Sequence, residues 1–98
     1  MTRTPVALVT GANRGIGFEM ARQLGEAGYA LWLGCRDAGK GDEAAARLSA
    51  QGIEAQALVI DVGDDASVGA AAETLSDRIE ALEVLVNNAG MHFGPPPP

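Results

Sequence analysis

The segment Thr10-Gly11-Ala12-Asn13-Arg14-Gly15-Ile16-Gly17 decides the fold of this chain, because it joins an apolar run to an amphipathic stretch. The run Val6-Ala7-Leu8-Val9 before it predicts a buried strand, and the residues after it predict a helix. A strand that ends at glycines and continues as a helix leaves backbone N–H groups unpaired at the positive end of that helix. Phosphate groups bind at such ends, so we predict a dinucleotide site here.

Each glycine of this segment has a separate mechanical role. Gly11 allows the sharp exit from the strand, and Gly15 removes the side chain that would hold the backbone away from a phosphate. Gly17 lets the first helical turn lie close to the sheet. The spacing is Gly-x-x-x-Gly-x-Gly instead of the general Gly-x-Gly-x-x-Gly fingerprint, so a glycine-rich turn without a ligand stays open as an alternative.

Apolar runs alternate with segments of helical period along the whole chain. We predict strands over residues 5–10, 29–35, 55–61 and 83–87, and helices over residues 14–27, 42–51 and 65–82. Parallel neighbours need a crossover long enough for a helix, so this order predicts an α/β fold with a parallel, doubly wound sheet of the Rossmann type. Right-handed crossovers then give the strand order 3-2-1-4, with a ligand crevice at the carboxyl ends of the first and fourth strands.

Two of the predicted helices carry apolar faces that we expect to pack on the sheet. The faces consist of Ile16, Met20, Leu24 and Ala27 in the first helix, and of Val68, Ala72, Leu75, Ile79 and Leu82 in the last. Asp64 or Asp65 is the expected cap of the last helix, and Asp42 stands near the start of the middle one. Gly28 and Gly52 follow the ends of the first two helices.

A second motif, Asn87-Asn88-Ala89-Gly90, follows the last predicted strand. The two motifs, in this order and at this separation, resemble the amino-terminal half of a short-chain dehydrogenase/reductase, and residues 33–37 and 58–62 are most similar to its carbonyl-reductase-like members. The resemblance extends from Val6 to about Gly90. It implies the dinucleotide-binding portion of an oxidoreductase that transfers hydride between a nicotinamide and a carbonyl or alcohol.

The choice of cofactor depends on the residues after the second strand, where a carboxylate would hold a ribose 2′-OH and an arginine a 2′-phosphate. The resemblance implies that Cys35 stands at the acidic position of NAD-preferring relatives. Arg14 and Arg36 occupy two basic positions that NADP-preferring members use. A guanidinium binds phosphate bidentately and stays charged, so we predict NADP(H). Two alternatives remain: both arginines are solvated surface residues, or Asp37 accepts the ribose hydroxyl and moderates the selectivity.

The resemblance implies further contacts with the cofactor. Asp61 would lie by the adenine amino group and Val62 against the ring, although Asp61 serves equally well as a turn carboxylate. Asn88, Ala89 and Gly90 would let the backbone pass close to the nicotinamide ribose, and a plain strand-ending turn explains them too. The remaining predicted cofactor contacts come from the glycine segment: Gly11, Asn13, Arg14, Gly15, Ile16 and Gly17.

The family's catalytic groups, a Ser and a Tyr-x-x-x-Lys pair with an Asn, have no counterpart in these 98 residues. Tyr29 is the only tyrosine and Lys40 the only lysine, and Leu33 stands four positions after Tyr29. We therefore expect the chain to be inactive alone. A non-catalytic dinucleotide-binding or regulatory module is the alternative. Cys35 is interpreted as a small residue at a strand end and His92 as a loop residue.

Composition sets the remaining expectations. The net charge of −6 opposes binding to nucleic acid or anionic membranes. One cysteine excludes an internal disulfide and suits a reducing cytosol, and no leader or long apolar run is present, so we expect a cytoplasmic protein. Residues 1–94 form one dinucleotide-binding domain and residues 95–98 a proline-rich tail. The fourth strand would lie at an open apolar edge, so we expect self-association.

Overall fold

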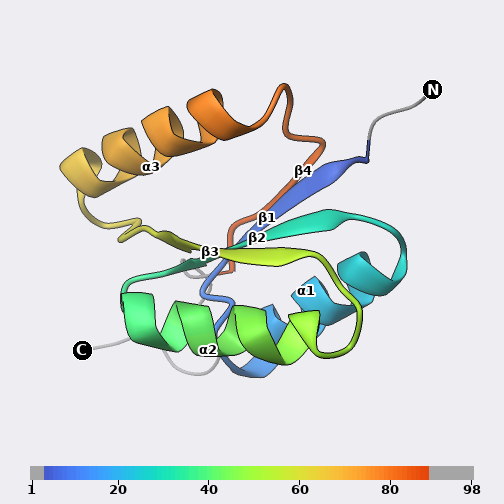
Figure 1. Ribbon diagram of the computed structural model, residues 1–98. Helices are drawn as coiled ribbons and strands as arrows, with labels where there is room; N and C mark the ends of the chain where they lie inside the picture. Colours follow the sequence, from blue (N-terminus) through green and yellow to red (C-terminus); the bar gives the residue numbers. More distant parts are fainter. Residues whose placement is uncertain (1–3, 89–98) are drawn as a thin grey trace.

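The computed structural model describes residues 4–88, which form three layers (Figure 1). Four strands make up the middle layer: β1 Val6–Thr10, β2 Ala30–Cys35, β3 Ala55–Val59 and β4 Val84–Val86. All neighbouring strands are parallel, and their order in the sheet is β3-β2-β1-β4. The predicted α/β class and the strand order 3-2-1-4 are therefore confirmed. The predicted tail, residues 95–98, lies outside the described residues.

Three helices cover the sheet. α1 (Gly15–Glu26) and α2 (Ala38–Ser49) lie on one face, and α3 (Asp65–Arg78) lies on the other (Figure 1). Each helix follows a strand and returns the chain to the start of the next one, as parallel pairing requires. All three helices therefore begin at the same end of the molecule, the end at which the strands finish. No helix among residues 4–88 is long and apolar enough to cross a membrane.

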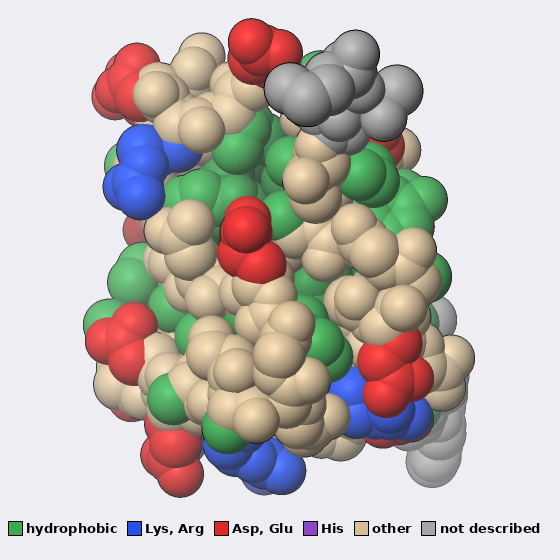
Figure 2. All heavy atoms as spheres, turned by 45° about the vertical axis from the view of Figure 1, so that its right-hand side comes forward, with side chains coloured by type: hydrophobic (Ala, Val, Ile, Leu, Met, Phe, Trp, Pro, Cys, Tyr) green, Lys and Arg blue, Asp and Glu red, His purple; other side chains and the backbone are tan. Residues whose placement is uncertain are grey.

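The strands alternate between two apolar cores, as the two-residue period of a strand dictates. Val9, Leu31 and Leu33 point to the side of α1 and α2, where Ala44 and Leu48 pack on them. The smaller core under α3 is built from Leu8, Trp32, Leu58, Ile60 and Ala71. On the face shown in Figure 2, apolar side chains fill the seam beneath α3, and acidic side chains are scattered across the surface.

The middle helix begins earlier than the sequence pattern predicted. α2 starts at Ala38 and not near Asp42, because the Asp37 carboxylate caps it by accepting the Lys40 backbone N–H at 3.0 Å. Gly39 and Gly41 have poor helix propensity and conceal this start in the sequence. Packing compensates at Gly41, where an added Cβ would lie 3.1 Å from both the Ala57 Cβ and the Cys35 Sγ.

The last helix ends earlier than predicted. α3 stops at Arg78, because Ile79 is extended, with φ −134° and ψ 152°, and turns the chain toward β4. Asp64 caps this helix through the Ala66 N–H at 3.0 Å, as one of the two predicted caps. Ile79 still packs, half-buried, against the core under α3, so its apolar side chain extended the helical pattern beyond the helix itself.

The two predicted apolar helix faces were partly wrong. In α1, Gly17 and Ala21 are buried, whereas Ile16 is 55% exposed and Ala27 is exposed. In α3, Ala71 is the buried residue. Val68 and Leu82 are exposed, contrary to the prediction. The fully buried positions are small residues, which let the helix backbone approach the sheet closely, while the predicted Leu24 and Leu75 pack partly buried against the two cores.

Candidate functional site

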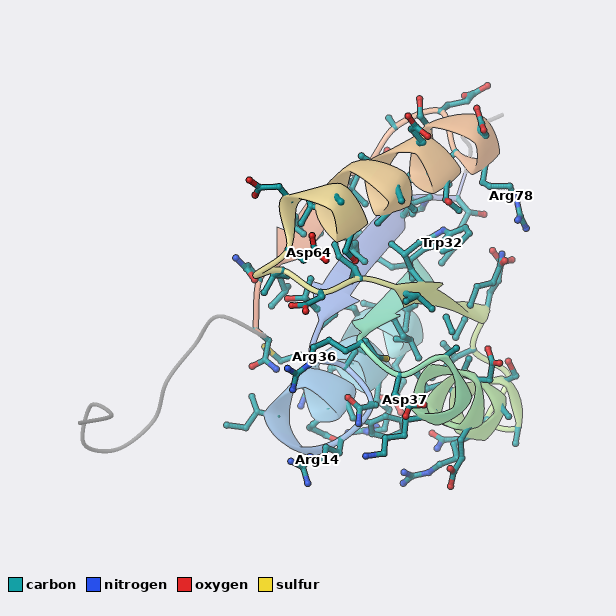
Figure 3. The ribbon with its side chains drawn as sticks, turned by 90° about the vertical axis from the view of Figure 1, so that its left-hand side faces the viewer. Arg14, Trp32, Arg36, Asp37, Asp64 and Arg78 are labelled. Atoms are coloured by element: carbon teal, nitrogen blue, oxygen red, sulfur yellow. The ribbon has the colours of Figure 1, made fainter. Side chains whose placement is uncertain are left out.

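A cleft of about 490 Å³ opens at the carboxyl ends of the strands, next to the start of α1. Figure 3 looks onto this end of the molecule, with Arg36 above and Arg14 below the start of α1. β2 and β4 flank β1 on its two sides, so the cleft at the carboxyl end of β1 lies at the switch point where α/β sheets bind ligands. It is lined by Gly11, Asn13, Arg14, Gly15, Cys35, Arg36, Ile60, Asp61, Val62 and Asn88.

The start of α1 lacks a side-chain cap from its N-cap residue. Its N-cap residue, Arg14, makes no side-chain hydrogen bond to the first turn, and that turn holds no acidic residue. Asp37 and Asp64 cap the other two helices among the described residues. Within residues 4–88 the first-turn N–H groups of α1 therefore have no side-chain acceptor, and Arg14 and Gly15 at this helix start line the cleft, which favours an anion there.

The three glycines of the loop differ in backbone angle and in surrounding space. Gly11 and Gly15 have φ values of 62° and 63°, in the left-handed region that other residues rarely adopt. An added Cβ at Gly15 would meet nothing within 4 Å, so its backbone faces open space. A Cβ at Gly17 would lie 2.2 Å from the Gly11 carbonyl oxygen and 2.6 Å from Asn88 Nδ2. Gly17 thus lets α1 pack against the glycine loop itself and against Asn88.

Side chains at the end of β4 hold the loop in place. Asn88 Nδ2 donates to the Gly11 carbonyl oxygen at 3.2 Å, and the buried Thr10 hydroxyl donates to Asn87 Oδ1 at 3.0 Å. The amides of Asn87 and Asn88 therefore join the fourth strand to the first, 77 residues apart along the chain. Ala89 and Gly90 of the same motif lie outside the described residues.

Basic side chains differ sharply in whether they have partners. Arg22 bonds to Glu19 and Glu26, and hydrogen bonding to Arg22 first and Gln23 second lowers the pKa of Glu19 to about 2. Arg47 lies 4.4 Å from the centre of the Phe18 ring, and Arg78 lies 5.6 Å from the centre of the Trp32 ring.

Three cations have no such partner. Arg14, Arg36 and Lys40 make no side-chain hydrogen bond, ion pair or ring contact within residues 4–88. Arg14 and Arg36 line the cleft, and Lys40 lies in the adjoining first turn of α2. Unneutralised positive charge in this acidic protein is therefore gathered beside the open start of α1.

Asp37 and Asp61, whose roles the sequence left open, both accept hydrogen bonds from nearby backbone N–H groups. Asp37 Oδ1 is occupied by its cap to Lys40, and Asp37 does not line the cleft (Figure 3). Asp61 Oδ1 accepts the Gly63 N–H at 3.0 Å, which is the turn role, and Asp61 also lines the cleft beside Val62. Each carboxylate keeps a second oxygen. The geometry therefore favours Asp61 over Asp37 as the acid that faces a ligand.

The observed lining of the cleft differs from the predicted contacts at several residues. Ile16 and Gly17 do not line it, and Ile16 projects into solvent. Ile60 and Cys35 line it without having been predicted as contacts. Burial raises the pKa of the Cys35 thiol, with Asp37 and Asp42 adding to the rise, so Cys35 is an inert wall residue. Within residues 4–88 no group of three or more His, Cys, Asp or Glu side chains is arranged for a metal ion.

A glycine in β2 was also missed by the sequence reasoning. An added Cβ at Gly34 would lie 2.8 Å from Ile60 Cγ2 and 3.3 Å from the Thr10 Cα. Gly34 therefore leaves room over the end of β2 for the side chain of Ile60, which lines the cleft. A glycine inside a predicted strand signals such a close approach and could have been used to find it.

Comparisons with known proteins agree with this geometry. Residues 5–97 match the family model described as short chain dehydrogenase. The chain is 40% identical over 92 residues to retinol dehydrogenase 12 of Bos taurus, covering 92% of this chain and 29% of the relative. It is 45% identical over 89 residues to (+)-neomenthol dehydrogenase of Arabidopsis thaliana, covering 87% and 30%.

Solved structures show the same similarity. The menthone neomenthol reductase of Mentha piperita superposes with a TM-score of 0.83 at 40% identity, covering 92% of this chain and 33% of that one. The NADP complex of Pseudomonas aeruginosa RhlG gives a TM-score of 0.83 at 40% identity, covering 89% and 35%. The chain thus spans about a third of the length of these relatives. By the match over nearly all of its residues, the chain belongs to the short-chain dehydrogenase family.

Proposed function

We propose that this chain is the NADP(H)-binding portion of a short-chain oxidoreductase acting on a carbonyl or alcohol. The observation that carries the proposal is an uncapped α1 start on the same cleft as Arg14 and Arg36, which have no partner within residues 4–88. An uncapped helix start favours a pyrophosphate, and two free guanidinium groups favour an additional phosphate. The NADP complex of a structure 40% identical to this chain supports the same choice.

Different residues of the cleft would bind different groups of the cofactor. The first turn of α1 would bind the pyrophosphate, with Gly15 leaving room for it. Arg14 and Arg36 would bind the 2′-phosphate of the adenosine ribose, and Asp61 with Val62 would enclose the adenine. Asn88, with Ala89 and Gly90, would border the nicotinamide ribose. When bound, NADPH supplies a hydride; these residues position it and hold its charges.

Charge-matched variants test the choice of cofactor. We expect the chain to bind NADPH more tightly than NADH, by about 1.5–3 kcal/mol for a well-formed charged hydrogen bond. Arg36→Gln should reduce this difference, and Arg36→Asp should erase or invert it. Arg22→Gln removes one positive charge from a residue of α1 that is ion-paired elsewhere, and it should leave the preference intact.

Calorimetric titration of each variant with both cofactors is the measurement. Equal dissociation constants of the unmutated chain for NADPH and NADH would refute the NADP(H) proposal. An equal loss in Arg36→Gln and Arg22→Gln would show that net charge, and not a contact from Arg36, determines the binding.

A further inference from the structure

Hydrogen bonds hold Asp61 in place just after the end of β3. The Asp61 backbone N–H donates to Ser67 Oγ at 2.8 Å, and the Asp61 carbonyl oxygen accepts the Asp64 N–H at 3.0 Å. The Asp61 carboxylate accepts the Gly63 N–H through Oδ1, also at 3.0 Å. The backbone N–H, the backbone carbonyl and the carboxylate of this residue therefore each have a partner, so the turn that leads into α3 has a defined conformation.

Ser67 differs from the other two partners of Asp61 in where it comes from. Gly63 and Asp64 belong to the turn itself, where such local bonds are common, whereas Ser67 lies in the first turn of α3. In Figure 3, Asp64 marks this helix start at the same end of the molecule as Arg36. The Ser67 side chain is half-buried and lines a groove of about 390 Å³ between α3 and β3, not the cleft. Ser67 therefore contacts Asp61 from behind, outside the space that a ligand would fill.

The Asp61 N–H needs this acceptor because of its place in the sheet. The Ile60 N–H still donates to the Cys35 carbonyl oxygen of β2, at 3.0 Å. Successive N–H groups of an extended chain point to opposite sides, so the Asp61 N–H points away from β2. β3 is the outer strand among the described residues, so the sheet as described offers no backbone acceptor on that side. Without the Ser67 hydroxyl, this part-buried N–H would lose its partner, and the Asp61 backbone would be free to reorient together with its carboxylate.

We infer that Ser67 is a positioning residue that fixes the Asp61 carboxylate at the cleft and thereby determines the preference for adenine over other purines. This inference rests on the proposed function, in which Asp61 and Val62 enclose the adenine. Adenine offers its amino group as a donor, whereas hypoxanthine carries a carbonyl oxygen at the same position. An aspartate carboxylate only accepts hydrogen bonds, so it binds the first group and repels the second. Such discrimination requires a carboxylate whose backbone is held in one place by supporting hydrogen bonds.

Two dinucleotides that differ only in the purine test the inference. NADPH and its analogue with hypoxanthine in place of adenine are titrated calorimetrically into the full chain and its variants. The unmutated chain should prefer NADPH by about tenfold, and Ser67→Ala should reduce this ratio by about threefold or more, the contribution of one hydrogen bond. Ser67→Thr keeps the hydroxyl and should keep the ratio. Thr74→Ala is the matched control, because the Thr74 hydroxyl lines the same groove but donates to the Ala70 carbonyl oxygen at 3.1 Å, within α3. Its ratio should equal that of the unmutated chain.

A double-mutant cycle shows whether Ser67 acts through Asp61. Asp61→Ala should abolish the preference for adenine, and adding Ser67→Ala should then leave the ratio unchanged.

The ratio of the two affinities separates positioning from a merely structural role. A structural role would weaken both dinucleotides by the same factor in Ser67→Ala, and that result overturns the inference. So does a further fall of the ratio when Ser67→Ala is added to Asp61→Ala. A chain that prefers NADPH over NADH but does not distinguish the hypoxanthine analogue overturns the inference and leaves the proposed function in place. A chain that binds none of these dinucleotides refutes both.

Discussion

At the scale of single residues, the site depends on which charged side chains have bonding partners. It also depends on the space and the backbone angles that the glycines provide. Arg14 and Arg36 have no partner among residues 4–88, whereas Arg22, in the helix that starts at the same loop, is held by two carboxylates. Gly17 is required for space and Gly15 for its backbone angle. The two requirements predict different responses to substitution.

The first residue-scale prediction concerns Gly17. Gly17→Ala would place a Cβ 2.2 Å from the Gly11 carbonyl oxygen, so the loop must shift; we expect a loss of about 1–3 kcal/mol in the free energy of unfolding and weakened NADPH binding. Gly69→Ala is the matched control, because an added Cβ there meets nothing within 4 Å in α3. It should stabilise the chain by about 0.5–1 kcal/mol. Urea denaturation measures both, and equal effects would contradict the packing argument.

The second residue-scale prediction concerns Asp37, whose carboxylate caps α2 at 3.0 Å. Asp37→Ala should cost about 0.5–2 kcal/mol of stability, and Asp37→Ser should keep most of it because a hydroxyl also caps. Chemical denaturation checks the stability. NADH titration of Asp37→Ser distinguishes the alternative role: a specific loss of NADH affinity would show that Asp37 accepts the ribose hydroxyl.

At the scale of elements, the two faces of the sheet are unequally covered. α1 and α2 bury one face, whereas α3 covers part of the other and leaves a hollow of about 340 Å³ toward β4. Leu85 of β4 lines this hollow and is 60% exposed. β4 has a single partner strand, β1, among the described residues, so its other edge presents unpaired backbone groups. Such an edge recruits other chains.

The element-scale prediction is that the chain associates with itself through β4. Leu85→Lys places a charge beside the β4 edge and should shift sedimentation toward the monomer, because inward-pointing or edge lysines block strand pairing. Val59→Lys is the control: Val59 is 53% exposed on β3, at the opposite edge, and its substitution should leave association unchanged. A cooperative monomer of the unmutated chain, with strongly protected amides in β4, would contradict this prediction.

At the scale of the whole molecule, residues 1–98 contain the cofactor cleft but no Ser with a Tyr-x-x-x-Lys pair. We predict that a protein of these residues binds NADPH without transferring hydride to carbonyl compounds. A placed general acid contributes roughly 10²–10⁴-fold to such reactions, and the Tyr-x-x-x-Lys arrangement does not occur in residues 1–98. NADPH absorbance with purified protein is the measurement. Turnover that co-purifies with the chain and disappears in Gly15→Trp would contradict the prediction.

The sequence alone determined the α/β class, the strand order and the location of the cleft. Short apolar runs mark the strands, and the handedness of the crossovers gives their order. Glycines at Gly11 and Gly15 permit positive φ whatever surrounds them. Only the tertiary structure decided that α2 begins at Ala38 and that Ala71 and not Val68 faces the core. It also decided that Arg36 and Lys40 have no partner within residues 4–88 while Arg78 stacks on Trp32. Burial and ion pairing depend on residues distant in the chain, and no local pattern of sequence records which of them meet.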